Sequence, residues 1–168
     1  MDLKTIEESL LHLEEYPIEK WNPQLCEGVR FDIDSNSSWF YNNSKIERLS
    51  MIRLFSKLLK FENGNYFVVT PSEKIPVFVD KEIYSIIDFR KEKGDYYFKT
   101  NTEEWIKLTK LNPLSVEIKE NQPYPRLSLK TNVYGLLTRS LFYNLISEAE
   151  ADRSKLYIKS DGTFFFLN

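Results

Sequence analysis

Two arginines, Arg48 and Arg139, have the residue type and position that most favour ligand chemistry in this sequence. Each lies close to the expected start of an amphipathic helix, where a cation gains nothing from the helix dipole, since cations are stabilised at the opposite end. An arginine in that position needs another partner, such as an acidic side chain, a carbonyl group or an anionic ligand. The two arginines are therefore candidate anion ligands, with a structural ion pair or a solvated side chain as the alternatives.

Three further residues extend this candidate site. Lys74 lies in a turn after Thr70-Pro71, where it could converge with an arginine on a phosphate, which arginine grips in bidentate geometry. Trp39 and Tyr41 alternate along one expected strand, and their rings could stack on a base. The alternatives are a solvated charged turn for Lys74 and core packing for both rings.

Other chemistry has little support in the sequence. The single histidine, His12, falls on the polar side of the expected first helix, so solvent exposure is favoured over a catalytic or metal site. The segment that starts at Asp32 resembles the beginning of a calcium loop, but Ser37 and Asn43 replace the required glycine and acidic residue. The sequence shows no recognisable pair of nucleophile and base, so a hydrolase that acts through Asp32 and Asp34 is the least favoured hypothesis.

The composition excludes several protein classes. The chain has 168 residues and a net charge of −2, so it offers no overall basic stripe for duplex nucleic acid. Its one cysteine, Cys26, allows neither an intrachain disulfide nor a cysteine zinc cluster, and we expect it to be a small buried residue. The longest apolar runs fall far short of the ~20 residues of a membrane span. We expect a cytoplasmic protein without a cofactor, and the oligomeric state stays open.

Hydrophobic periodicity predicts an α+β fold rich in strands. Thr5 and Glu8 have the form of a capping box for a first helix, which Tyr16-Pro17 ends. Two more helices are expected over about 47–60 and 138–150. Strands are expected at about 29–34, 39–41, 66–70, 76–79, 84–90, 96–100, 105–108, 114–119, 126–130, 155–159 and 163–167.

The two later helices, with their hairpins, align at an offset of 91 residues, which predicts a structural repeat. This offset places Arg48 on Arg139. Further identical pairs are Leu54 with Leu145, Ser56 with Ser147 and Tyr66 with Tyr157. We therefore expect an N-terminal helix over 1–20, a first module over 21–82 and a second over 83–168, packed as one unit. A ligand site is expected where the modules meet.

Several blocks of residues resemble the bacterial DUF1285 family. They are Trp39-Phe40-Tyr41, Ile46-x-Arg48, Leu54-Phe55-Ser56, Tyr66-x-Val68-Val69-Thr70-Pro71-x-Glu73-Lys74, Phe98-x-Thr100-Asn101, Pro113-Leu114 and Gly135-Leu136-x-x-Arg139. The resemblance implies a duplicated α+β architecture whose C-terminal half is similar to pleckstrin-homology domains. It also implies a nucleotide-like ligand and a signalling role, and it adds Asn101 to the candidate binding residues.

Three hypotheses follow for the function. The first is a non-catalytic regulatory protein that binds a small anionic, nucleotide-like ligand through Trp39, Tyr41, Arg48, Lys74, Asn101 and Arg139. The second is a protein-interaction module that uses the exposed edges of its sheets. The third, and least favoured, is the hydrolase.

Overall fold

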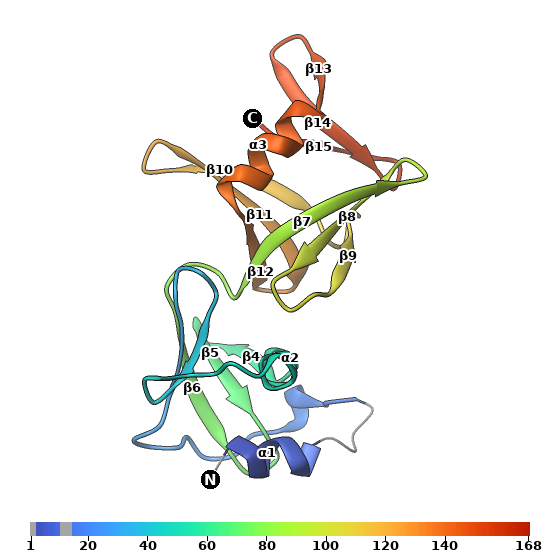
Figure 1. Ribbon diagram of the computed structural model, residues 1–168. Helices are drawn as coiled ribbons and strands as arrows, with labels where there is room; N and C mark the ends of the chain where they lie inside the picture. The colour runs from blue at the N-terminus through green and yellow to red at the C-terminus, as the bar shows by residue number, and fades with distance from the viewer. Residues whose placement is uncertain (1–2, 11–14) are drawn as a thin grey trace. The chain divides into compact units, whose positions relative to one another are not determined.

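The computed structural model describes residues 3–10 and 15–168, and the chain divides into two compact units. Unit 1 is Met1–Lys81 and unit 2 is Glu82–Asn168 (Figure 1). The elements of unit 1 are α1 (Leu3–Leu10), the 3₁₀ helix η1 (Ile18–Lys20), β1 (Phe31–Ile33), β2 (Trp39–Tyr41), β3 (Ser44–Lys45), α2 (Leu49–Lys57), β4 (Leu59–Glu62), β5 (Asn65–Val69) and β6 (Lys74–Val79).

Unit 2 contains nine strands and one helix. They are β7 (Tyr84–Glu92), β8 (Asp95–Thr100), β9 (Trp105–Lys107), β10 (Leu114–Lys119), β11 (Gln122–Lys130), β12 (Val133–Leu137), α3 (Arg139–Ser147), β13 (Glu150–Asp152), β14 (Lys155–Ser160) and β15 (Thr163–Phe166). The fold is therefore α+β and mostly β, as expected. The predicted likeness of this unit to pleckstrin-homology domains stays a prediction.

Each unit contains one six-stranded mixed sheet. The strand orders are β3-β2-β1-β6-β5-β4 and β10-β11-β12-β7-β8-β9. Each sheet consists of two antiparallel three-stranded meanders that are joined by one parallel pair, β1 with β6 and β12 with β7. We expected antiparallel strands throughout, and that expectation was wrong at these two joins, because parallel pairing needs a distant crossover that turn residues do not announce.

The predicted repeat is present, and it has two levels. α2 and α3 are each followed by a three-stranded antiparallel meander, β4-β5-β6 in unit 1 and β13-β14-β15 in unit 2. The first meander completes the six-stranded sheet of its unit, whereas the second forms a separate three-stranded sheet. At the same time, β1–β6 and β7–β12 form sheets of equivalent strand order. The meander β4-β5-β6 thus has two counterparts in unit 2.

The core of unit 1 is built around Phe31 on β1. Its ring centroid lies 5.8 Å from that of Trp39 and 5.0 Å from that of Phe55 on α2. Ile6 and Leu10 of α1 are also buried. The apolar stripes of α1 and α2 are therefore shielded from water, as amphipathic helices require.

One core fills unit 2 and joins all of its layers. Strand alternation turns Ile158 and Phe165 inward, where they share a cluster with Phe98 of β8 and with Phe142 and Leu145 of α3. Because both sheets and the helix contribute to one cluster, the small sheet is part of the unit and not an appendage.

Four strands are absent from the predicted set, and the short β3 is one of them. β4 follows α2 at once, at residues we expected to continue the helix, and β13 stands in the same relation to α3. β12 was not predicted, since its sequence contains a glycine and no clear alternation. Thr5 lies inside α1, whose described part begins at Leu3, so its prediction as an N-cap was wrong.

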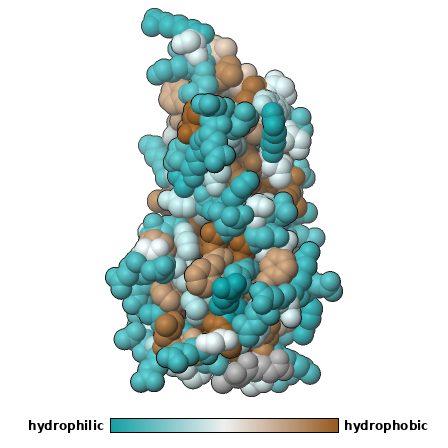
Figure 2. All heavy atoms as spheres, turned by 90° about the vertical axis from the view of Figure 1, so that its left-hand side faces the viewer, coloured by the Kyte–Doolittle hydropathy of each residue, from teal (hydrophilic) through white to brown (hydrophobic). Residues whose placement is uncertain are grey.

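Apolar side chains also reach the surface, interleaved with hydrophilic ones on the face drawn in Figure 2. Such scattered exposure is ordinary for a folded chain. Among residues 3–10 and 15–168, no helix exceeds the nine residues of α2 and α3, and none is long and apolar enough to cross a membrane.

Gly135 at the parallel join of unit 2 gives a stability prediction. A Cβ atom there would lie 2.5 Å from Cδ1 of the buried Ile86. We expect Gly135→Ala to lower the free energy of unfolding by ~1–3 kcal/mol through overpacking, as measured by urea denaturation. Ile86→Val removes the clashing methyl group, so the double variant should lose less than the sum of the single losses. Additive losses would contradict the clash.

Candidate functional site

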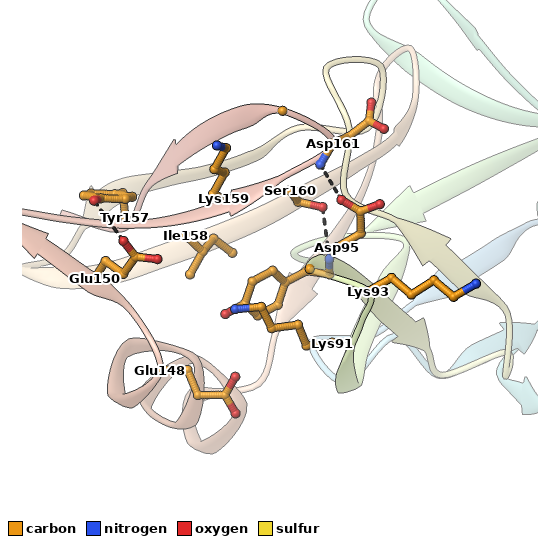
Figure 3. A pocket seen from close by; sticks show the side chains of 13 residues that line it. Lys91, Lys93, Asp95, Glu148, Glu150, Tyr157, Ile158, Lys159, Ser160 and Asp161 are labelled. Atoms are coloured by element: carbon orange, nitrogen blue, oxygen red, sulfur yellow. Dashed lines mark hydrogen bonds between the residues drawn. The ribbon is translucent and has the colours of Figure 1, made fainter.

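Unit 2 contains an open hollow of about 310 Å³ between two hairpin turns and the end of α3 (Figure 3). One turn joins β7 to β8 and contributes Lys93, next to Lys91 at the end of β7, and the other follows β14. Further lining residues are Gly94, Asp95, Tyr96, Glu148, Glu150, Tyr157, Ile158, Lys159, Ser160, Asp161 and Gly162. Lys93, Gly94, Asp161 and Gly162 all have positive φ, the conformation that two-residue hairpin turns require.

Lys107 ties the two turns together. Its ammonium group lies 2.8 Å from a carboxylate oxygen of Asp95 and 2.8 Å from one of Asp161. The backbone N–H of Asp161 also donates to Asp95, at 2.7 Å. The hydrogen bond from Lys107, followed by that from the Asp161 backbone, lowers the pKa of Asp95 below its ordinary value. The carboxylate of Asp95 is therefore ionised, and one ammonium group is shared between Asp95 and Asp161.

Ser160 closes the floor of the hollow and is itself buried. Its hydroxyl oxygen accepts from the Tyr96 N–H at 3.0 Å, and the hydroxyl donates to the Leu108 carbonyl at 2.9 Å. The hydroxyl group is therefore committed to holding β14 against β8. It is not poised to act as a nucleophile, because no base reaches it.

The remaining charges of the hollow are not neutralised by neighbours. Lys91, Lys93 and Lys159 form no ion pair with any carboxylate of the described residues, and the Lys91 ammonium lies 5.0 Å from the centroid of the Tyr96 ring. On the opposite side, Glu150 accepts a hydrogen bond of 3.1 Å from the Tyr157 hydroxyl, which raises the pKa of Tyr157. In Figure 3, Lys91 lies between the helix end that carries Glu148 and the turn at Asp95.

Arg48 lies just before α2 and pairs with a buried carboxylate. Its Nη2 lies 2.9 Å from Oε2 and 3.0 Å from Oε1 of Glu7 on α1, and the Ser50 hydroxyl also donates to Glu7. The side chain of Glu7 is 8% exposed and that of Arg48 is 59% exposed. A carboxylate at a helix start is stabilised by the dipole. Glu7 is therefore the partner that an arginine at the start of a helix was expected to need.

Arg139, the equivalent residue in unit 2, has different surroundings. It is exposed at the first turn of α3, with its guanidinium carbon 5.7 Å from the ring centroid of Tyr143. Arg48 belongs to unit 1 and Arg139 to unit 2. The prediction that they serve one ligand therefore stays a prediction.

The predicted aromatic residues have unequal exposure. Trp39 is 1% exposed and packs edge-on against Phe31, so its ring contributes to the core. Tyr41 is partly exposed, 5.1 Å from Phe31 between ring centroids. Asn101 holds a loop, because its backbone N–H donates to the Ser85 carbonyl and its Oδ1 accepts from the Ser85 N–H. Trp39, Tyr41 and Asn101 therefore all make contacts within the core or within a loop.

Lys74 on β6 forms an ion pair of 2.9 Å with Glu62 on β4. Asp32 is paired with Arg30, and Asp34 accepts two backbone N–H groups of the following turn, so neither is arranged as a catalytic acid–base pair. Cys26 is partly exposed, so its expected burial was wrong, because its segment pairs by backbone contacts with the start of β6 at Lys74. His12 lies outside the described residues.

The lining of the hollow includes none of the six predicted binding residues. Two turn signals, Lys93-Gly94 and Asp161-Gly162, mark the right hairpins in the sequence, and lysines stand beside both. Nothing local indicates that turns 66 residues apart share a lysine bridge. That information resides in the long-range packing of β14 on β8.

We expect Arg48→Met to lower the free energy of unfolding of unit 1 by ~1–3 kcal/mol, because it leaves the buried Glu7 carboxylate without its charged partner. Arg139→Met is the matched control, and it should stay within ~0.5 kcal/mol of the unsubstituted protein. Denaturant melts of both variants measure this, and equal losses would contradict a structural role specific to Arg48.

The lysine bridge predicts a pH dependence. A carboxyl group with a lowered pKa contributes stability above its unfolded pKa of about 4, and this is lost as the pH falls through the folded value. We expect Lys107→Met to be less stable than the unsubstituted protein at pH 7, with the difference shrinking toward pH 2. Lys110→Met, an exposed lysine of the same unit, should show no such trend in urea unfolding across this range. A difference independent of pH would contradict the bridge.

The comparisons with known proteins identify relatives without naming an activity. A crystal structure of a DUF1285 family protein from Silicibacter pomeroyi DSS-3 matches with a TM-score of 0.84 and 26% identity, over 99% of this chain and 94% of that one. A second, from Shewanella baltica OS155, matches with a TM-score of 0.58 and 23% identity, over 73% and 94%. At that identity the second likeness shows the fold alone. No curated protein matches the chain.

Family models agree with the structural relatives. The N-terminal domain of DUF1285, a domain of unknown function, matches residues 16–82. The C-terminal domain of DUF1285, a protein of unknown function, matches residues 84–167. The chain therefore belongs to the DUF1285 family.

Proposed function

We propose that this protein is a non-catalytic binding protein for a small anionic ligand, and that the hollow of unit 2 holds the ligand. The observation that carries the proposal is the state of its charges. Asp95 and Asp161 share the ammonium group of Lys107, whereas Lys91, Lys93 and Lys159 form no ion pair with the described carboxylates. Of these three, Lys91 lies between the helix end that carries Glu148 and the turn at Asp95 (Figure 3), so its ammonium group is the one that would meet a ligand with a negative charge.

The opposite wall of the hollow favours a ligand with hydrogen-bond donors as well. Glu148 and Glu150 present carboxylates there, and a carboxylate accepts from amino groups. A nucleotide combines both features, because its phosphate is anionic and its base carries donors. The volume of about 310 Å³ lies within the range of small-molecule sites. A regulatory role then requires only that binding alters the stability or the partners of the protein.

Binding is favoured over catalysis by the state of the reactive groups in the hollow. The Ser160 hydroxyl bridges two strands, and the Tyr157 hydroxyl donates to Glu150, which raises the pKa of the phenol. A phenol with a raised pKa is ionised to a smaller extent at neutral pH, so less of the nucleophilic phenolate is present. The hollow thus offers charge and hydrogen bonds without an activated nucleophile.

The test is a thermal-shift and calorimetric titration with AMP, ATP, adenosine and inorganic phosphate. We expect the nucleotides to bind and adenosine, which lacks a phosphate, to bind more weakly. A nucleotide at 100 times its dissociation constant should stabilise the protein by ~2.7 kcal/mol. Lys91→Met should weaken binding about tenfold, since a charge-assisted hydrogen bond contributes ~1.5–3 kcal/mol.

Lys110→Met is the matched control for this titration, because Lys110 is an exposed lysine of unit 2 outside the hollow. It should bind every probe as the unsubstituted protein does. Binding that is unchanged in Lys91→Met, or the absence of any response to the four probes, would overturn the proposal. If none of the four probes gives a response, a protein-interaction role is favoured instead. The surface for that role would include Phe164 and Phe166, which are both about half-exposed on β15.

A further inference from the structure

Two lysines of unit 1 lie almost buried on one face of its sheet. The side chain of Lys60 on β4 is 12% exposed and that of Lys74 on β6 is 14% exposed. The segment after η1 covers them. The Lys60 ammonium donates to the Trp21 carbonyl at 3.2 Å, and the Cys26 N–H donates to the Lys74 carbonyl at 2.8 Å. Lysine is seldom this buried unless its charge is paired.

The charges at this place do not balance. Glu62 Oε2 lies 2.9 Å from Nζ of Lys74 and 4.0 Å from Nζ of Lys60. Within residues 3–10 and 15–168, no other carboxylate forms an ion pair with either lysine. The hydrogen bond from Lys74 lowers the pKa of Glu62, so this carboxylate is ionised. Two positive charges thus share one negative charge.

Neighbouring groups compensate only part of the remaining charge. The Lys74 ammonium lies 4.5 Å from the centroid of the Phe67 ring, a cation–π distance. Each ammonium group has three donors. Lys60 uses one on the Trp21 carbonyl and Lys74 one on Glu62, which leaves donors on both. Because Glu62 is itself 34% exposed, the pair is open to solvent on the Glu62 side.

We propose that Lys60 and Lys74 form a second ligand site, which binds a phosphate group, free or esterified. A phosphate dianion placed between the two ammonium groups matches their charge when Glu62 turns away, and it takes up the free donors of both lysines. Glu62 then acts as an internal competitor that occupies the site in the absence of phosphate. This site lies within unit 1 and does not depend on the hollow of unit 2.

Isothermal titration calorimetry with inorganic phosphate and with glycerol phosphate tests the proposal, at fixed ionic strength with chloride as the balancing salt. Constant ionic strength matters because phosphate also stabilises proteins by general exclusion from their surface. We expect Lys74→Met and Lys60→Met each to weaken phosphate binding at least ~10-fold. Lys57→Met, an exposed lysine of the same unit, is the matched control and should bind as the unsubstituted protein does.

Glu62→Gln separates a binding role from a structural one. If Glu62 competes with phosphate, its neutral counterpart should bind phosphate about tenfold more tightly, a gain that misfolding cannot produce. Repeating this titration with Lys91→Met as the parent protein leaves the lysine pair of unit 1 intact, so failure here and failure of the hollow are distinguishable. Tighter binding of glycerol phosphate than of inorganic phosphate would identify an esterified ligand. Unchanged or weaker phosphate binding in Glu62→Gln, or full binding in Lys74→Met, would overturn the proposal.

Discussion

The parallel strand pair in the middle of each six-stranded sheet is the contact on which the rest of the structure depends. Each pair involves three residues per strand, yet it joins two meanders that would otherwise present open edges. In unit 2 the join demands a glycine, because Gly135 stands where any Cβ would meet Ile86. In unit 1 the pair also holds Phe31 of β1 in the sheet against which Phe55 of α2 packs.

Local chemistry predicted the elements of this fold better than their assembly. The hairpins at Lys93-Gly94 and Asp161-Gly162 were evident because the residues in the turn dictate its geometry. The helix stripes were evident because burial on one face imposes a period of 3.6 residues. The parallel joins were not, since partners such as Phe31 and Val77 lie 46 residues apart and no turn connects them. β4 was not predicted, because Leu59 continues the apolar pattern of the preceding helix.

The candidate site shows the same division between local and distant information. Sequence reasoning identified Arg48 as a residue that needs a partner, and left open whether that partner is a carboxylate or a ligand. The carboxylate is Glu7, 41 residues earlier in the chain. The hollow of unit 2 was missed because its lysines look like ordinary turn residues. They differ from ordinary surface lysines only because two turns pack around Lys107 beside them.

The repeat itself explains why equivalent positions have different chemistry. An offset of 91 residues places Ala151 and Phe165 at the positions of Lys60 and Lys74, so unit 2 has no counterpart of this lysine pair. Two charged residues of unit 1 have partners in segments before the repeat, since Arg48 pairs with Glu7 on α1 and Lys60 donates to the Trp21 carbonyl after η1. Duplication therefore supplied the backbone, while residue changes within the repeated meander, such as Lys60 and Lys74, together with contacts from outside it decide what each unit can bind. Two sites of different composition in two similar units are the expected result.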